Sequence, residues 1–362
     1  MTAARIDRLR GQLPEWKADA LVLTNPANRM YATGFSSYLG MPWSADCAII
    51  GPDSVDLLVA AIHAGWARGE SVVATDVVSH KGAYASSLAA FLEERGFRSV
   101  AVEADSLPYP EGNKLQDAFS GQIEFVSGLR DVLRTVKDES ELALLREAAY
   151  ITDAVFEEIA AGTLIGRTEA DLARSISARL IENGDGLAFD VIVASGPNSA
   201  RPHHRPSART IQEREPIMID MGARIGGYCG DLTRTLWVGD YDERFVAMYR
   251  AVLAAQEATK AVMTDGTPVR EVGRAADQSL QDSGYGEYIL HSVGHGVGLD
   301  IHEAPSIRPE LNAVLESSSV VTVEPGVYMP DWGGIRIEDV VVVGSETCET
   351  ITGASKLMTL QG

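Results

Sequence analysis

The spacing of apolar residues predicts that the first part of the chain alternates strands and helices. Short apolar runs such as ALVLT at 20–24 and CAIIG at 47–51 have the length of buried strands. The segment AYASSLAAFLEERG at 83–96 instead repeats its apolar residues at helical spacing and ends at a glycine. This alternation is typical of an α/β domain, which we place at residues 1–132.

A helix start marks the beginning of a second domain. In VKDESELALLREAAYITDAVFEEI, Asp138 and Glu141 stand three residues apart, which is the spacing of a capping box. Apolar residues then continue along one helical face. A second helix is predicted after Thr168 and ends at Asn183-Gly184. The second domain is therefore expected to begin near residue 133.

The rest of the chain becomes rich in strand-like runs from about residue 215 onward. It contains one helix-like interval, near 243–264. Helices followed by strands predict an α+β domain, which we place at residues 133–362.

Two aspartates interrupt the apolar pattern of IMIDMGARIGGYCGDLTRT at 217–235. A two-residue hairpin turn at Gly226-Gly227 would make Asp220 and Asp231 diagonal neighbours on one face of the strand pair. A turn at Ile225-Gly226 would place the two acids directly opposite each other. Both registers bring the two carboxylates to the same face, because side chains alternate along a strand.

Two carboxylates held this close repel each other, so one must be protonated or a cation must lie between them. The simpler alternative is that one acid faces solvent and the other caps a turn. A second segment, VVTVEPGVYMPDWGGIRIEDVVVV, adds Glu324 and Glu338 in strand-like runs separated by prolines and glycines. Arg336 shares a face with Glu338, and alone these two would be read as a surface ion pair. Four acids in strand pairs of one domain favour a common site.

Histidines gather in the same domain. The segment HSVGHGVGLDIHE carries His291, His295 and His302, and the glycines around His295 indicate backbone that is closely approached. The loop VASGPNSARPHHRPS adds His203 and His204 between prolines. A single histidine is more often a core residue than a ligand, but this clustering favours a functional site.

Composition narrows the class of protein. The apolar content of 45% and charged content of 23% are those of a globular protein, and 362 residues suit two domains. The formal net charge of −20 argues against binding to nucleic acid or to an anionic membrane. Three widely spaced cysteines form no disulfide framework, and the first residues contain no apolar signal segment. A cytoplasmic location is expected.

The candidate ligands are four carboxylates and one imidazole. Such an oxygen-rich set suits Mn²⁺, Co²⁺, Fe²⁺ or Zn²⁺ better than copper. Because carboxylates can bridge, it can hold two ions about 3.5–4 Å apart, as in hydrolases with paired metals.

These residues resemble those of a known family. The phrases IDMG, DLTRT, GHGVGLDIHE, VEPGVY and GIRIEDV are similar to those of the pita-bread metallopeptidases, which include methionine aminopeptidase, aminopeptidase P and prolidase. Residues 1–132, with NPANRMYATGF at 25–35, resemble the N-terminal domain of the creatinase, prolidase and aminopeptidase P branch. The resemblance implies a creatinase-like α/β domain followed by a pita-bread catalytic domain. It is greatest to bacterial Xaa-Pro dipeptidases.

The resemblance also implies how the metal ions are held. Asp231 and Glu338 match the carboxylates that bridge two metal ions, most commonly Mn²⁺. His295 and Glu324 match the remaining ligands of one ion, and Asp220 matches a ligand of the other.

Further residues match positions that act on the substrate. Glu324 matches the residue that takes a proton from the bridging water. His203 and His302 match histidines that stabilise the tetrahedral intermediate. His291 and Arg336 match positions that contact the substrate or support the ligands.

The function implied is hydrolysis of the Xaa-Pro bond of dipeptides or short peptides by a metal-bridging hydroxide, in a homodimer. Three alternatives stay open: an aminopeptidase P acting on longer peptides, a hydrolase or lyase of another substrate such as ectoine or a sulfonium compound, and an inactive binding module. The five intact ligands argue against the metal-free creatinases and against the inactive module.

Overall fold

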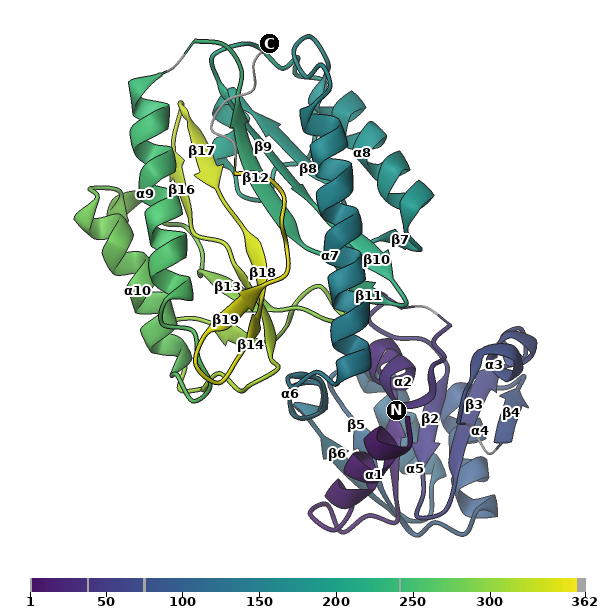
Figure 1. Ribbon diagram of the computed structural model, residues 1–362. Coiled ribbons are helices and arrows are strands. Elements are labelled where there is room, and N and C mark those ends of the chain that lie inside the picture. The colour runs from purple at the N-terminus through teal and green to yellow at the C-terminus, as the bar shows by residue number, and fades with distance from the viewer. Residues whose placement is uncertain (1, 38, 74–75, 241, 357–362) are drawn as a thin grey trace. The chain divides into compact units, whose positions relative to one another are not determined.

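The computed structural model describes residues 2–37, 39–73, 76–240 and 242–356 of the chain (Figure 1). They form two compact units, Met1–Arg134 and Thr135–Gly362. The assignment of domains to 1–132 and 133–362 stays a prediction. None of the described helices is long and apolar enough to cross a membrane.

The first unit is a mixed six-stranded sheet with the order β4-β3-β2-β1-β5-β6. The pairs β1–β2 and β2–β3 are antiparallel and the other three are parallel. Its elements in chain order are α1 (Thr2–Gln12), β1 (Ala20–Leu23), α2 (Pro26–Thr33), β2 (Cys47–Ile50), β3 (Val55–Ala60), α3 (Ala64–Glu70), β4 (Asp76–His80), α4 (Tyr84–Glu94), β5 (Ser99–Glu103), α5 (Tyr109–Ala118), β6 (Gln122–Val126) and α6 (Leu129–Arg134).

The expected alternation of strands and helices in this unit is confirmed. Leu88 and Leu92 lie four residues apart on α4, so both face the sheet and pack with Val22 and Val102. Strands β1 and β2 are buried along their whole length, which explains why their sequences are apolar without alternation.

The second unit begins with two helices and continues with short strands and two more helices. Its elements are α7 (Glu139–Ala160), α8 (Glu169–Asn183), β7 (Gly186–Leu187), β8 (Ile192–Ser195), the 3₁₀ helix η1 (Gly196–Ala200), β9 (Pro216–Met221), β10 (Ala223–Ile225), β11 (Tyr228–Cys229), β12 (Leu232–Trp237), α9 (Glu243–Lys260), α10 (Val269–Asp282), the 3₁₀ helix η2 (Gly286–Tyr288), β13 (Gly294–Gly296), β14 (Glu303–Ile307), β15 (Val320–Val323), β16 (Gly326–Met329), β17 (Gly333–Arg336), β18 (Asp339–Val343) and β19 (Cys348–Thr350).

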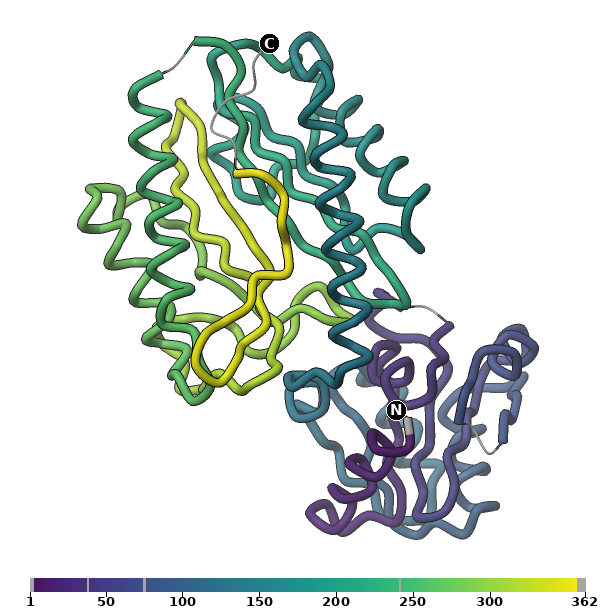
Figure 2. Tube along the Cα trace, in the orientation of Figure 1, coloured from purple at the N-terminus to yellow at the C-terminus, as the bar shows by residue number. Residues whose placement is uncertain are grey.

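Each helix pair covers its own set of strands. Helices α7 and α8 pack on the sheet β12-β9-β8, where Phe156 and Ile176 meet Ile219 in one apolar cluster. Helix α10 packs on the sheet β14-β13-β15-β18-β19, and α9 packs on the β16–β17 hairpin. The strands therefore lie between the two helix pairs, as the ribbon and the chain trace both show (Figures 1 and 2).

The hairpin at Gly226-Gly227 is confirmed. Both glycines have positive φ, 54° and 90°, which glycine adopts without steric cost. Ile225 pairs with Tyr228, and the same register continues into β9 and β12, where Asp220 pairs with Thr233. The alternative turn at Ile225-Gly226 is therefore wrong.

Glu324 and Glu338 differ from expectation, because they lie between strands and not inside them. Glu324 joins β15 to β16, and Glu338 joins β17 to β18. At both points the chain passes from the five-stranded sheet to the two-stranded hairpin or back. The change of sheet interrupts the hydrogen-bonded strand pairing at each glutamate. Apolar residues on both sides of each glutamate make this interruption hard to recognise in the sequence.

Helix α10 is a second helix in a region where the sequence predicted one. Its apolar residues do follow helical spacing, but it lacks a side-chain N-cap and contains Gly273 in its interior, both of which disfavour a helix. Pro309 packs against this glycine, because a Cβ at position 273 would lie 3.1 Å from Pro309 Cδ. The tertiary contact explains a residue that by itself disfavours a helix.

The capping box at the start of α7 allows a test of the fold. Asp138 Oδ1 accepts hydrogen bonds from the backbone N–H groups of Ser140 and Glu141, both at 3.0 Å, and Glu141 Oε2 accepts one from Asp138 N–H at 2.9 Å. Asp138→Ala is expected to lower the free energy of unfolding by about 1 kcal/mol, measured by urea unfolding. Asp138→Asn keeps a capping oxygen and should lower it less. Equal effects of the two variants would contradict this role.

Candidate metal centre

The predicted ligands come from separate strands of the second unit and meet between its sheets. Asp220 lies on β9 and Asp231 directly precedes β12, whereas His295 lies on β13 of the five-stranded sheet. Glu324 and Glu338 are added at the strand junctions described above. The site therefore exists only when the two sheets pack together.

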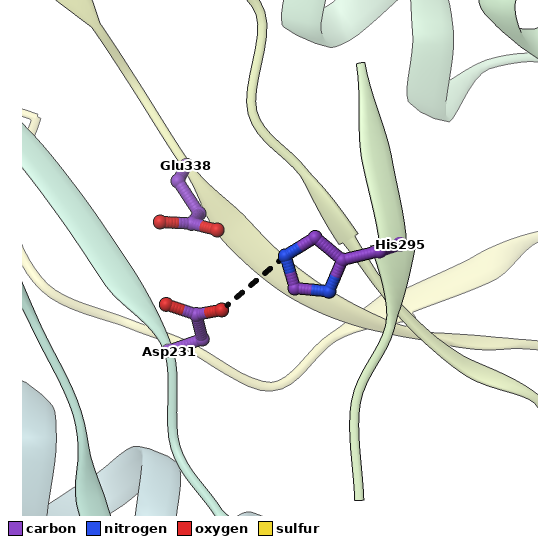
Figure 3. Close-up of side chains that lie close together, drawn as sticks. All are labelled: Asp231, His295 and Glu338. Carbon is purple, nitrogen blue, oxygen red and sulfur yellow. Dashed lines mark ion pairs between the residues drawn. The ribbon is translucent and has the colours of Figure 1, made fainter. Parts of the chain in front are cut away.

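Three of the five predicted ligands converge closely. Carboxylate oxygens of Asp231 and Glu338 and a ring nitrogen of His295 lie within 4.8 Å of one another (Figure 3). His295 Nε2 is 3.7 Å from Asp231 Oδ2 and 3.4 Å from Glu324 Oε1. The structure thus brings Glu324 to the same nitrogen.

The orientation of His295 suits a metal ligand. Its Nδ1 lies 3.0 Å from the carbonyl oxygen of Gly296, an acceptor, so Nδ1 carries the proton and donates. The lone pair is then on Nε2, which faces the carboxylates. Burial lowers the pKa of His295, which favours the neutral imidazole that a metal needs.

Asp220 is the fifth predicted ligand and has one oxygen without a partner among the described residues. Its Oδ2 accepts a hydrogen bond of 2.7 Å from Arg336. Its Oδ1 is buried and has no hydrogen-bond partner among the described residues. A buried carboxylate oxygen without a partner is costly, and a bound cation would remove that cost.

Arg336 lies inside the protein and not at the surface. Its side chain is 3% exposed and bonds to Asp220, whereas that segment read alone would give a surface ion pair with Glu338. It also donates to the Tyr328 hydroxyl at 2.8 Å and to Thr233 Oγ1 at 3.0 Å. Arg336 therefore orients the ligands and cannot act as a solvated surface charge.

Sequence reasoning missed two residues of this network. The Tyr328 hydroxyl lies 2.7 Å from His291 Nε2, so it links His291 to Arg336. Thr233 Oγ1 donates to Glu338 Oε2 at 2.7 Å. Both are strand residues of ordinary type, and only the packing of neighbouring strands reveals their polar contacts.

His302 and His203, which are predicted to contact the substrate, lie at the edge of the group formed by the five predicted ligands. The rings of His302 and His295 have centroids 4.4 Å apart, and His302 is exposed. His203 is exposed too. Burial is the largest cause of the lowered pKa of His291, and His203 contributes a smaller electrostatic effect in the same direction. His204 turns away from the cluster, because its Nε2 contacts Glu169 at 2.9 Å.

The buried carboxylates of the predicted ligands need nearby positive charge to be stable in their ionised form. Burial, followed by repulsion from the other carboxylates, raises the pKa values of Asp231 and Glu338 well above the usual range. Burial also raises the pKa of Glu324. Among the described residues, Arg336 is the one buried cation that donates a hydrogen bond to a side-chain carboxylate of the predicted ligands. Four carboxylates and one cation fit a site for divalent metal ions.

Comparison with known proteins agrees with the family resemblance found in the sequence. The model of the creatinase/prolidase N-terminal domain matches residues 5–136, and that of metallopeptidase family M24 matches residues 143–345. An Xaa-Pro dipeptidase of Pyrococcus horikoshii is 31% identical over 92% of this chain and 92% of its own length. These matches confirm the expected fold class.

Two solved structures are similar over nearly their whole length. The Xaa-Pro dipeptidase from Bacillus anthracis has a TM-score of 0.92 and 34% identity, and the match covers 99% of this chain and 100% of that one. The X-Pro aminopeptidase from Thermotoga maritima has a TM-score of 0.86 and 28% identity, covering 97% and 100%.

Glu338 and Asp339 are adjacent acids at the start of β18, and they should respond in opposite ways to neutralisation when metal is removed. The pKa of Glu338 is raised, so its charge costs stability as the pH rises above about 4. Glu338→Gln should therefore raise the Tm of chelator-treated protein at pH 7, with a smaller gain at acidic pH.

The matched control is Asp339→Asn. Burial alone would raise the pKa of Asp339, but Arg234 and Lys356 lower it overall. Its charge therefore stabilises the fold above the usual carboxyl pKa, and that contribution is lost as the pH falls. Asp339→Asn should lower the Tm at pH 7. A fall in Tm for both variants would contradict the electrostatic account.

Proposed function

This chain belongs to metallopeptidase family M24, and we propose that it hydrolyses the Xaa-Pro bond of dipeptides or short peptides with two divalent metal ions. The observation that carries the proposal is the convergence of Asp231, His295 and Glu338, with the unpartnered Asp220 Oδ1 beside Arg336. The printed names of the similar dipeptidases support the choice of substrate. Mn²⁺ is the proposed metal.

The ligands divide into two groups in this proposal. Asp231 and Glu338 would contact both ions, His295 and Glu324 would complete one site, and Asp220 would belong to the other. Bound there, the two ions would lower the pKa of a water molecule and polarise the scissile carbonyl group.

In this proposal, side chains of the protein transfer the proton of the water molecule and stabilise the negative charge of the oxyanion. Burial raises the pKa of Glu324, so this carboxylate can accept a proton from water and return it to the leaving nitrogen of proline. His302 and His203 are exposed beside the cluster, where they can donate hydrogen bonds to the oxyanion.

A second candidate is an Xaa-Pro aminopeptidase acting on longer peptides. The similarity to the Thermotoga maritima X-Pro aminopeptidase supports it. The two activities share the same bond cleavage and differ in the length of substrate that the site admits. Ectoine is a third substrate to test, because the same fold can serve other C–N bonds.

A substrate panel with Mn²⁺ distinguishes these functions. Xaa-Pro dipeptides, Xaa-Pro-Xaa tripeptides, Met-Xaa peptides and ectoine are supplied at equal concentration, and kcat/KM is measured for each. We expect the highest value for an Xaa-Pro dipeptide. A higher value for the tripeptides would favour the aminopeptidase, and cleavage of Met-Xaa or ectoine alone would refute proline specificity.

Two substitutions separate metal binding from substrate activation. Asp231→Asn removes a shared ligand, so we expect fewer bound Mn²⁺ ions and a loss of more than about 100-fold in kcat/KM. His302→Ala should retain the metal content and lower kcat by about 100-fold to 1,000-fold, the typical cost of one oxyanion donor. Metal content is measured by elemental analysis. Loss of metal in His302→Ala would show that its role is misassigned.

A further inference from the structure

We propose that Glu169 is a positioning residue that holds His203 beside the candidate metal centre by fixing the chain on both sides of it. The kinetic part of this inference rests on the proposed function. Glu169 is the first residue of α8, and its side chain is completely buried. Sequence reasoning did not single it out.

The carboxylate of Glu169 binds both sides of the His203 loop. Oε1 accepts hydrogen bonds from the backbone N–H and the hydroxyl of Ser195, both at 2.8 Å, and from Asn198 Nδ2 at 3.0 Å. Oε2 accepts from the backbone N–H and the hydroxyl of Ser207, at 3.0 and 2.6 Å, and faces His204 Nε2 at 2.9 Å. It also accepts a longer bond of 3.2 Å from Asn198 Nδ2. One side chain thus joins the chain before His203 to the chain after it.

This arrangement is not ordinary helix capping. Thr168 already caps α8, because its side chain accepts from Asp171 N–H. The hydrogen-bond donors to Glu169 instead come from residues 195–207, outside the helix. The positive end of the helix dipole favours the charged carboxylate at this position.

The same loop is tied to the metal centre at its middle. The carbonyl oxygen of Pro202 accepts from Arg336 at 3.4 Å, and Arg336 binds the predicted ligand Asp220. Ser199 Oγ accepts from Gly334 N–H at 2.8 Å. His203 follows Pro202 directly, so the backbone that carries it is held from the side of Glu169 and from the side of Arg336.

The carboxylate of Glu169 must be charged to accept hydrogen bonds from both sides of the loop. Burial alone would raise the pKa of Glu169, but the hydrogen bonds from Ser207, Asn198 and His204 lower it to about 2. A glutamine cannot replace it, because the NH₂ group of its amide would face N–H donors. One of the two anchored segments would then lose its acceptor.

Hydrogen–deuterium exchange tests the anchoring without a substrate. In Glu169→Gln, the amides of residues 195–207 should exchange at least about 10-fold faster than in the wild type. The matched control is Glu141→Gln, a second buried glutamate, which binds the Tyr228 hydroxyl and Asp138 N–H. Faster exchange of residues 195–207 in both variants, or in neither, would overturn the inference.

A double-mutant cycle tests the link to His203. Glu169→Gln should lower kcat/KM for an Xaa-Pro dipeptide by about 10-fold to 100-fold, with Mn²⁺ content unchanged. In a His203→Ala background the same substitution should lower kcat/KM by less than about 3-fold, because the histidine that Glu169 positions is already absent. The Glu141→Gln control should cost the same factor in both backgrounds.

The outcomes separate the two proposals. Equal losses for Glu169→Gln with and without His203 would overturn positioning and would indicate a general effect on stability. If the wild type cleaves none of the peptides, the proposed function fails, and the exchange experiment still decides whether Glu169 anchors the loop.

Discussion

The repulsion between buried carboxylates is the constraint on which the second unit depends. Asp220, Asp231 and Glu338 are each less than a tenth exposed, and Glu324 lies beside them. Burying like charges together costs free energy unless cations compensate. Arg336 supplies one positive charge, and the chemistry of the remaining donors calls for metal ions. A protein built for stability alone would place apolar residues here, so the site is kept at a cost to the fold.

The surrounding structure holds these acids against their repulsion. Buried Arg234 bonds to the carbonyl oxygens of Thr233 and Glu338 and to Asp339 Oδ1, so it joins β12 to β18 next to the predicted ligand Glu338. It also bonds to the carbonyl oxygen of Ala354, at 2.8 Å, near the end of the described chain. Charged side chains outside the predicted ligand set thus fix the strands whose ends carry the predicted ligands.

The histidines of the proposed reaction need a different kind of support, because they lie on exposed segments. Glu169 fixes the loop of His203. A buried ion pair between Lys137 and Glu303, at 3.2 Å, lies directly after His302 and ties that segment to the start of α7. In both cases one buried carboxylate orders a short polar segment, and the catalytic unit gains rigid positions for groups that must meet the substrate.

The sequence by itself determined the local elements and the set of candidate ligands. Period and capping predicted α7 and α8, and the two glycines predicted the hairpin that brings Asp220 and Asp231 to one face. Tertiary structure decided the rest. In the structure Glu324 and Glu338 lie at strand junctions, and Arg336 is buried against Asp220. Glu169 binds residues of the segment 195–207. Such contacts join residues far apart in the chain, and no local pattern records them, because they arise only when separate sheets pack together.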